Sequence, residues 1–580
     1  MQLTYIEKNI RSALGKIKYG LVLTIIFAIV VVGYGVFVTL FSSPVHVGVD
    51  EELYISMART FHYEGKFMMG GELLNYNCVL YSMLISLAYY FYSPERIMLI
   101  IRLIGVISMC SSVYPVGLLA YRVLKDKRKA VFITVVLSMM PYMFDVAYAM
   151  QEVLSYPLFC WLILFLYELN DKDSNHNTIA CILIISVISV FLVYTKTYLF
   201  CVPIIINVVL IKRVIKDRNE ILKTVRMLIL YDVMYIIGFV SIYWGIYAIN
   251  GFQRGTNHYS TQISGLFPIT ISTILCGISC CVVYIGFFVV CTGLLPFISV
   301  CSKHDNCEHQ DGELIDFHVF GVFILVVEIV FMIIITEMGL NPLPGKFLFR
   351  YFQVFVPGIM ILALKRSGEN YDGRKIILWC EISLIICLIY FLFENGISHN
   401  AIIDGHIFLL IENISRNIIP HFNVIITVVT IIAVSIIGRL LMKGHNQIRI
   451  ICGFLTVAIL TLFIVQWIQL PYYTNIIAKG REIQQDSISI AHFLNDNNIE
   501  NVYYIQQEEE NPYLRNFYGA IKQDYIVCSS DTIYEYIDTS KRSVYIVPKL
   551  EGEIDSRFIE CDISLRNYRL FIGKLEKENE

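Results

Sequence analysis

The sequence predicts an α-helical protein with many membrane spans and a small α/β domain at its C-terminus. Of its 580 residues, 56% are hydrophobic and only 16% are charged, and the mean hydropathy is +0.63. A soluble domain of this length could not cover so much apolar surface, which places the chain among polytopic membrane proteins. Apolar runs of spanning length recur as far as about residue 473, and the composition changes after residue 474.

The apolar runs predict about thirteen spans of roughly 17 to 25 residues, the length that a hydrocarbon core requires. The first run, Leu21–Phe41, is too long for the apolar part of a signal peptide, and no small-residue cleavage site follows it. We therefore expect an uncleaved first span. The predicted spans are centred near Val30, Val106, Leu137, Leu162, Ser186, Ile205, Met234, Val282, Leu325, Phe355, Ile385, Thr427 and Ala458.

Clusters of Lys and Arg predict the orientation of these spans. One cluster precedes the first predicted span, and others follow the second, sixth and tenth, so that all fall on one side. The positive-inside rule makes that side cytoplasmic. We expect residues 1–20 to be a cytoplasmic N-terminus and residues 21–473 a transmembrane domain, with a first outer loop at 42–95. Residues 474–580 would then lie outside the cytoplasm.

The C-terminal segment has the pattern of a small α/β domain. Helical periodicity runs through residues 481–498, and short apolar runs at 501–507, 524–530, 543–549 and 567–575 predict strands. Helical patterns between the strands favour a partly parallel sheet. The sixteen cysteines of the chain lie mostly in apolar runs, so no disulfide framework is expected. The net charge of −3 gives no reason to expect a nucleic-acid partner.

The first outer loop contains three consecutive carboxylates, Asp50, Glu51 and Glu52, in the stretch VGVDEELYISMART. A helix capped by Asp50 would be amphipathic and suited to the membrane interface. Acids in a first helical turn also complement the helix dipole, so helix initiation is one interpretation of these residues. An active site at the membrane surface is the other. The apolar side would carry Leu53, Tyr54, Met57, Ala58 and Phe61, and the polar side Glu52, Ser56, Arg59 and Tyr63.

A second short apolar segment, residues 78–93, precedes Pro94 and is too short for a full span. It predicts a second interfacial or half-buried helix, followed by a true span over residues 96–124. The first outer loop is therefore expected to be long, ordered and partly embedded in the membrane.

The Asp-Glu pair, the Tyr three residues later and Ala58-Arg59 together resemble the first-loop signature of GT-C superfamily glycosyltransferases. The order of parts is similar to the bacterial branch related to protein O-mannosyltransferases and lipid A aminoarabinose transferases. The resemblance covers roughly residues 20–365, and Asn77 and Cys78 depart from it where the family often has prolines. It continues through YMFDVAYAMQEV, VYTKTYLFCVPI and GKFLFRYFQVFVPG, the last with an Arg-Tyr pair.

The resemblance implies inverting transfer of a sugar from a polyprenyl-phosphate donor to an acceptor hydroxyl at the outer face of the cell membrane. Such chemistry needs a carboxylate base and cations that stabilise the departing phosphate. The expected base is Asp50, with Glu51 as the alternative. The expected phosphate-binding cations are Arg350, Lys196 and Lys346, and the expected substrate-binding residues are Tyr54, Glu152 and Tyr351.

The partners would be the lipid-linked donor, a lipid, glycan or protein acceptor, and membrane lipids. No cofactor is certain, although a divalent metal is possible, with Glu152 as one candidate ligand. A zinc site at Cys301, His304, Cys307 and His309 is a weaker possibility, because the spacing matches no zinc finger. The alternative functions are a flippase for a lipid-linked glycan, and a polysaccharide polymerase or ligase that would use residues 394–421.

Overall fold

We analysed a computed structural model of the chain. It describes residues 19–42, 49–74, 76–169, 178–216, 221–251, 271–292, 309–330, 346–347, 349–366, 373–397, 402–403, 425, 428–429, 431–432, 436, 480–506, 520–523, 525–529, 543–548 and 558–573.

Six apolar stretches of the described chain are long enough to cross a membrane, which makes this a multi-pass membrane protein. Each coincides with a predicted span, and the one at Ile97–Leu124 contains two consecutive helices. The stretches are α2 (Tyr19–Phe41), α5 with α6 (Ile97–Cys110 and Val113–Leu124), α8 (Glu152–Leu169), α9 (Thr178–Thr195), α10 with the preceding 3-10 turn (Cys201–Lys216 and Thr197–Phe200) and α11 (Ile221–Ile249).

The predicted count of about thirteen spans is not confirmed. The centres near Leu137 and Phe355 fall at α7 (Lys127–Ser138) and next to α17 (Val356–Arg366), which have only 12 and 11 residues. Helices of that length do not cross a hydrocarbon core on their own. Three further centres lie in α13 (Ile271–Cys291), α15 (His309–Ile329) and α18 (Gly373–Ile397). The last two centres lie outside the described residues.

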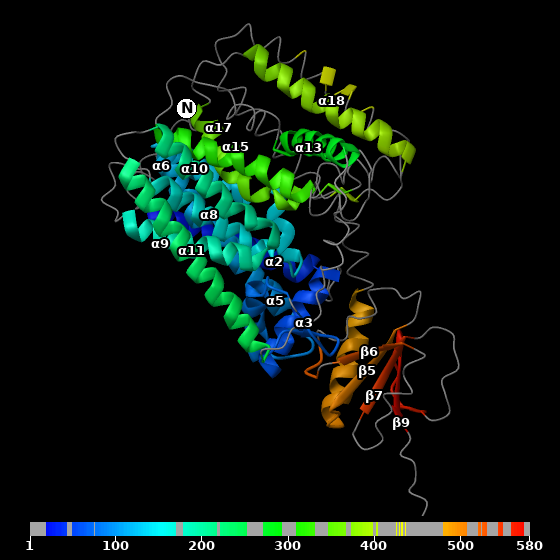
Figure 1. Cartoon of the computed structure of the whole chain (residues 1–580). Helices are drawn as coiled ribbons and strands as arrows, with labels where there is room; N and C mark the ends of the chain where they lie inside the picture. The colour runs from blue at the N-terminus through cyan, green and yellow to red at the C-terminus, as the bar shows by residue number, and fades with distance from the viewer. Residues whose placement is uncertain are drawn as a thin grey trace, which may run out of the picture.

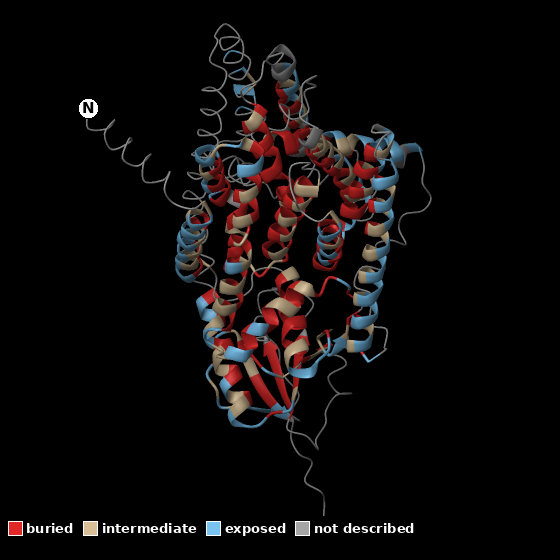
Figure 2. Ribbon diagram, turned by 90° about the vertical axis from the view of Figure 1, so that its left-hand side faces the viewer, coloured by how far each residue is buried: buried red, intermediate tan, exposed pale blue. Residues whose placement is uncertain are grey.

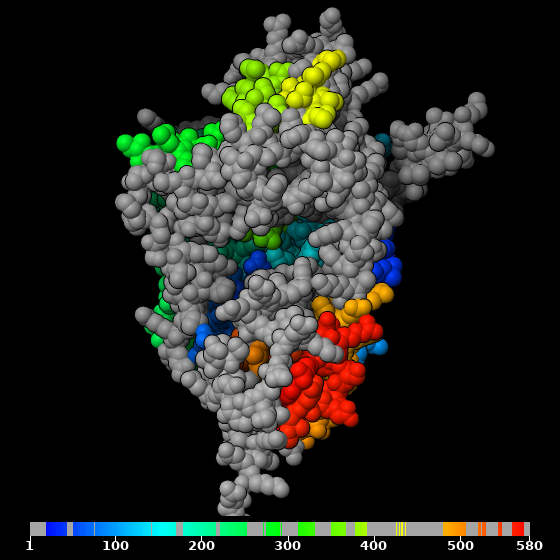
Figure 3. Space-filling view, turned by 90° about the vertical axis from the view of Figure 1, so that its right-hand side faces the viewer, coloured from blue at the N-terminus to red at the C-terminus, as the bar shows by residue number. Residues whose placement is uncertain are grey.

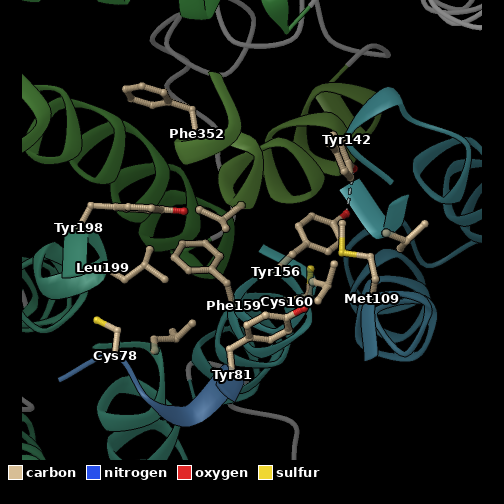
Figure 4. Packing of buried hydrophobic residues seen from close by; sticks show 14 of the residues in the cluster. Cys78, Tyr81, Met109, Tyr142, Tyr156, Phe159, Cys160, Tyr198, Leu199 and Phe352 are labelled. Atoms are coloured by element: carbon tan, nitrogen blue, oxygen red, sulfur yellow. Dashed lines mark hydrogen bonds between the residues drawn. The ribbon is translucent and has the colours of Figure 1, made fainter. Parts of the chain in front are cut away.

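Helix α8 forms the centre of the helical domain, where it packs against α9, α5 and α6 (Figure 1). Most of its apolar stretch is buried, 67%, against 11% for α11, so α11 is the more peripheral helix. Figure 2 shows buried residues gathered inside the helical domain and exposed residues on the outer sides of its helices. Figure 4 shows side chains of α8 packed among aromatic neighbours, with the hydroxyl groups of Tyr142 and Tyr156 2.8 Å apart. Phe159 packs edge to face against Phe355, with 4.9 Å between the ring centroids. Aromatic pairs prefer this arrangement to a face-to-face sandwich.

The described residues of the segment 42–95, the predicted first outer loop, form several short elements. The segment contains α3 (Val49–Glu64), a hairpin of β1 (Met68–Met69) and β2 (Glu72–Leu73), and a short helix, α4 (Leu80–Ile85), that continues as the 3-10 turn Ser86–Phe91. Both residues of the hairpin turn, Gly70 and Gly71, have positive φ, +61° and +84°. A tight turn of this kind requires that conformation, and glycine adopts it without strain.

The C-terminal segment forms the expected α/β unit. A helix at 480–496 precedes a five-stranded sheet with the strand order β6-β5-β7-β9-β8. The strands β6, β5 and β7 are parallel, and β9 is antiparallel to both of its neighbours. The four predicted strands correspond to β5 (Asn501–Gln506), β6 (Tyr525–Ser529), β7 (Ser543–Pro548) and β9 (Tyr568–Gly573). The short edge strand β8 (Phe558–Glu560) was not predicted.

Candidate functional site

The three consecutive acids of α3 point to three different parts of the molecule, as residues about 100° apart on a helix must. Asp50 is half exposed and lies 3.7 Å from the guanidinium of Arg350. Glu51 is buried, 3.9 Å from Arg102, and accepts a hydrogen bond of 2.6 Å from the backbone N–H of Ala149. Glu52, also buried, accepts one of 3.2 Å from the Tyr525 hydroxyl.

Two details of α3 differ from the sequence prediction. The helix begins at Val49, so Asp50 is its second residue and not its cap. Most of the polar side of the helix does not face water, because Glu52, Ser56 and Arg59 are as buried as the apolar side and only Tyr63 is exposed. The C-terminal sheet covers part of that polar side, and one sequence alone gave no sign of this contact.

Asp50 is the accessible end of a row of four alternating charges. Arg350 Nε lies 3.6 Å from Glu152 Oε1, and the same carboxylate oxygen accepts a hydrogen bond from the ammonium group of Lys196. The side chains of Asp50 and Arg350 are 45% and 28% exposed, whereas those of Glu152 and Lys196 are 1% and 8% exposed. A ligand would therefore reach the outer pair first.

The helix ends explain how these residues meet. Glu152 is the first residue of α8, and Arg350 lies in the 3-10 turn Phe349–Tyr351 that precedes α17. Lys196 has an extended backbone between α9 and the next 3-10 turn, which directs it into the bundle. Figure 3 shows that blue, cyan and green atoms, which come from segments far apart in the sequence, lie together on one face of the molecule.

Two tyrosines lie beside the cations. The Lys196 ammonium is 5.1 Å from the ring centroid of Tyr198 and 4.9 Å from that of Tyr351, distances typical of cation–π contacts. The guanidinium carbon of Arg350 is 5.5 Å from the Tyr351 ring. Burial raises the pKa of Tyr351 above its usual value, so this hydroxyl stays protonated and able to donate.

The structure thus brings together Asp50, Glu152, Lys196, Arg350 and Tyr351 among the residues expected from the sequence. It places Tyr54 in the hydrophobic core, edge to face with Tyr81 at 5.7 Å, and not at the accessible end. The backbone of Lys346 belongs to β3 (Lys346–Phe347), which pairs with β4 (Ile402–Ile403). The side chain of Lys346 lies outside the described part.

The sequence left a divalent metal at Glu152 and a zinc site at residues 301–309 as possibilities, and these can be compared only with the residues that the structure describes. Among those residues, no group of three or more His, Cys, Asp or Glu side chains could hold a metal ion. The candidate zinc ligands Cys301, His304 and Cys307, and most of the 394–421 stretch, lie outside the described residues.

Sequence reasoning missed Tyr198 and Tyr525 as neighbours of the charged residues. Tyr198 is two residues from Lys196, within the Thr-Lys motif, so proximity could have suggested it. Tyr525 had no such signal, because 473 residues separate it from Glu52.

The fold and the site define a multi-pass membrane protein with a charged site between α3 and the ends of three helical segments. ArnT from Cupriavidus metallidurans bound to undecaprenyl phosphate has a similar fold, with a TM-score of 0.54 and 12% identity over 95% of this chain and 98% of that chain. The structure of the same protein in the apo state has a TM-score of 0.52 and 11% sequence identity, over 94% of this chain and 98% of that chain. No protein-family model and no curated protein matches the sequence.

An oligosaccharyltransferase from Archaeoglobus fulgidus in its apo form gives a TM-score of 0.42 and 11% identity, over 92% of this chain and 70% of that chain. The likeness to ArnT confirms the predicted GT-C fold. It extends that fold beyond residues 20–365 to almost the whole chain.

Proposed function

We propose that the protein is an inverting glycosyltransferase that moves a sugar from a polyprenyl-phosphate donor to a hydroxyl of a lipid, glycan or protein acceptor. The observation that supports this most is the half-exposed carboxylate of Asp50 next to Arg350, with Lys196 behind it. A base and two cations in one site are what the reaction needs. ArnT, which has a similar fold, binds undecaprenyl phosphate, a ligand of the proposed donor class.

In the proposed reaction the acceptor oxygen attacks the anomeric carbon while its proton passes to Asp50. The bond between the anomeric carbon and the phosphate oxygen breaks, and the polyprenyl phosphate leaves with the electron pair. A positioned base of this kind typically contributes ~10²–10⁴-fold. Asp50 is the better base than Glu51, because Glu51 is buried and already engaged by Arg102 and Ala149.

The two cations serve the leaving phosphate in this proposal. A cation within ~4 Å of a phosphate oxygen gains on the order of 4 kcal/mol at an effective dielectric near 20. Arg350 and Lys196 repel each other, and the buried carboxylate of Glu152 contacts both, which stabilises their close approach. We assign Glu152 to holding the cations and Tyr351 to contacting substrate. Lys346 is proposed as a third phosphate-binding cation.

We propose that the site and the C-terminal domain face outward and that the N-terminus is cytoplasmic. The site lies at the start of α8, α10 and α17, and the basic clusters lie at the far ends of α10 and α17. Those far ends are joined through α15 by Lys212 with Asp316 and by Lys365 with Asp311. The positive-inside rule then makes that end cytoplasmic, with residues 21–473 spanning the cell membrane.

The test is Asp50→Asn in purified protein, assayed with polyprenyl-phosphate-linked sugars as donors. The substitution keeps the shape of the side chain and removes its basicity. Asp50 is half exposed and makes a long ion pair, so we expect an unchanged melting temperature and loss of nearly all transfer. Near-normal transfer by the Asn variant would contradict the proposal.

Glu51→Gln is the matched comparison. The amide oxygen can still accept from the Ala149 N–H, but Arg102 loses a buried counter-charge. We expect a lower melting temperature with measurable turnover, because unpaired buried charge is costly. The reverse pattern, an inactive and stable Glu51→Gln variant beside an active Asp50→Asn variant, would assign the base to Glu51.

A further inference from the structure

The polar side of α3 is covered by the C-terminal α/β domain. Glu52 accepts a 3.2 Å hydrogen bond from the Tyr525 hydroxyl, and Arg59 donates one of 2.6 Å to the backbone carbonyl of Gln523. The Arg59 guanidinium carbon also lies 5.6 Å from the Tyr525 ring centroid. Glu52 and Arg59 are seven residues apart, about two helical turns, so they share one side of the helix.

These contacts involve charges that water does not reach. Glu52 is 2% exposed and Arg59 is 0% exposed. Buried charges are tolerated when hydrogen bonds and opposite charges compensate them. The domain therefore supplies part of the compensation that lets α3 keep two charged side chains inside the protein.

We propose that the C-terminal domain positions the base, with Tyr525 as the positioning residue. Glu52 lies in the same helical turn as Asp50, two residues further on, so the hydroxyl that fixes Glu52 also fixes the direction of the Asp50 side chain. A displacement of about 1 Å of a reacting group can cost ~10²-fold in rate. This inference rests on the proposed function of Asp50 and deepens it by giving the appended domain a role in the same site.

The domain also contacts the first outer loop away from the first turn of α3. The Tyr92 hydroxyl donates a 2.6 Å hydrogen bond to the backbone carbonyl of Ala520, and the Lys522 ammonium lies 4.8 Å from the Tyr92 ring centroid. A side chain at Gly71 would approach Ile526 Cγ1 to 3.1 Å. The Tyr92 contact gives a matched control, because it is also a tyrosine hydroxyl between loop and domain.

The experiment compares Tyr525→Phe with Tyr92→Phe in the full-length protein, using the donor series that tests Asp50. For Tyr525→Phe we expect kcat to fall about tenfold with donor KM within about twofold. The melting temperature should also fall, because the buried Glu52 carboxylate loses a hydrogen bond. For Tyr92→Phe we expect kcat within about twofold of wild type. Glu52→Gln retains an acceptor for the Tyr525 hydroxyl and should keep more activity than Glu52→Ala.

Hydrogen exchange gives a readout that does not depend on chemistry. Amides of residues 53–56, which bond back to the first turn of α3, should exchange faster in Tyr525→Phe than in Tyr92→Phe. Equal exchange and equal kcat in the two Phe variants would overturn the positioning role. An equal loss of kcat in both Phe variants, whatever the exchange rates, would also overturn it. Any contact that holds the C-terminal domain against the membrane domain would then matter equally, and Tyr525 would have no special role. Failure of the proposed function is distinguishable, because wild type would lack transfer or Asp50→Asn would retain it.

Discussion

At the residue scale, the three consecutive acids of α3 lie in three different environments, although they belong to one helical turn. Asp50 faces the cations, Glu51 the core of the membrane domain and Glu52 the C-terminal domain. Helix initiation alone would leave all three carboxylates in water, yet two of them are buried. Their identical chemistry in the sequence therefore conceals three environments, which only the fold separates.

Substitution of Arg350 distinguishes two roles, because a residue that binds the donor phosphate should change the donor KM, whereas a residue that only pairs with Glu152 should change stability. Arg350→Met removes a charge-assisted contact worth about 2 kcal/mol, so the donor KM should rise by roughly 30-fold with little change in acceptor KM. Arg350→Lys keeps the charge but loses the planar fork, and its effect should be smaller. Donor and acceptor titrations of both variants measure this.

The control for Arg350 is the melting temperature of the same two variants. Glu152 keeps Lys196 as a partner, so the Met variant should remain folded. A well-folded Met variant with unchanged donor dependence would remove Arg350 from the site. A large loss of stability that a charge exchange with Glu152 restores would make the pair structural.

At the element scale, close packing between helices sets where the functional segments stand. A Cβ on Gly321 of α15 would lie 2.3 Å from Phe355 Cε1, on a ring that also packs against Phe159 of α8. Phe355 ends the short 3-10 turn Gln353–Phe355, which follows Arg350 and Tyr351 and directly precedes α17. Glycine at position 321 therefore leaves the space that the Phe355 ring occupies, and this packing helps to set the position of the segment that contains Arg350 and Tyr351.

We expect Gly321→Ala to destabilise the protein by about 1–3 kcal/mol, because an aromatic ring in a packed core cannot move aside without strain. Gly312→Ala is its control on the same helix, since among the described residues no atom other than the nearby backbone of α15 itself lies within 4 Å of the added methyl group. That change should be neutral or stabilise by up to ~1 kcal/mol, as alanine favours helix. Thermal unfolding in detergent compares them, and equal melting temperatures would contradict the packing argument.

At the scale of the whole molecule, the orientation in the membrane decides whether the proposed chemistry can occur. The basic ends of α10 and α17 meet α15 at the end opposite the site. In the proposed orientation the C-terminal domain would lie outside the cytoplasm, where it contacts α3 and Tyr92. Donor and acceptor would then meet at the outer surface, with Asp50 between the bilayer and the covering domain.

Labelling of intact cells with an impermeant thiol reagent tests this orientation. Ser564 is exposed in the C-terminal domain, and Lys127 is exposed at the start of α7. We expect Ser564→Cys to be labelled from outside and Lys127→Cys only after the cells are opened. Both changes are made in a cysteine-free variant, because the chain has sixteen cysteines and the structure describes the burial of twelve of them. The opposite pattern would place the domain in the cytoplasm.

The sequence by itself determined the class of fold, because hydropathy and strand periodicity are local properties. It located six stretches long enough to span a membrane and four strands of the C-terminal sheet. It did not establish the number of spans, since short helices such as α7 share the composition of long ones.

Only the tertiary structure decided which charges meet. The row from Asp50 through Arg350 and Glu152 to Lys196 joins four segments, and no local pattern specifies their relative placement. The same holds for Tyr525 at Glu52, where nothing in the local sequence of either partner indicates the contact. A charge in the sequence carries a cost of burial, but the partner that offsets this cost depends on how the helices and the sheet pack.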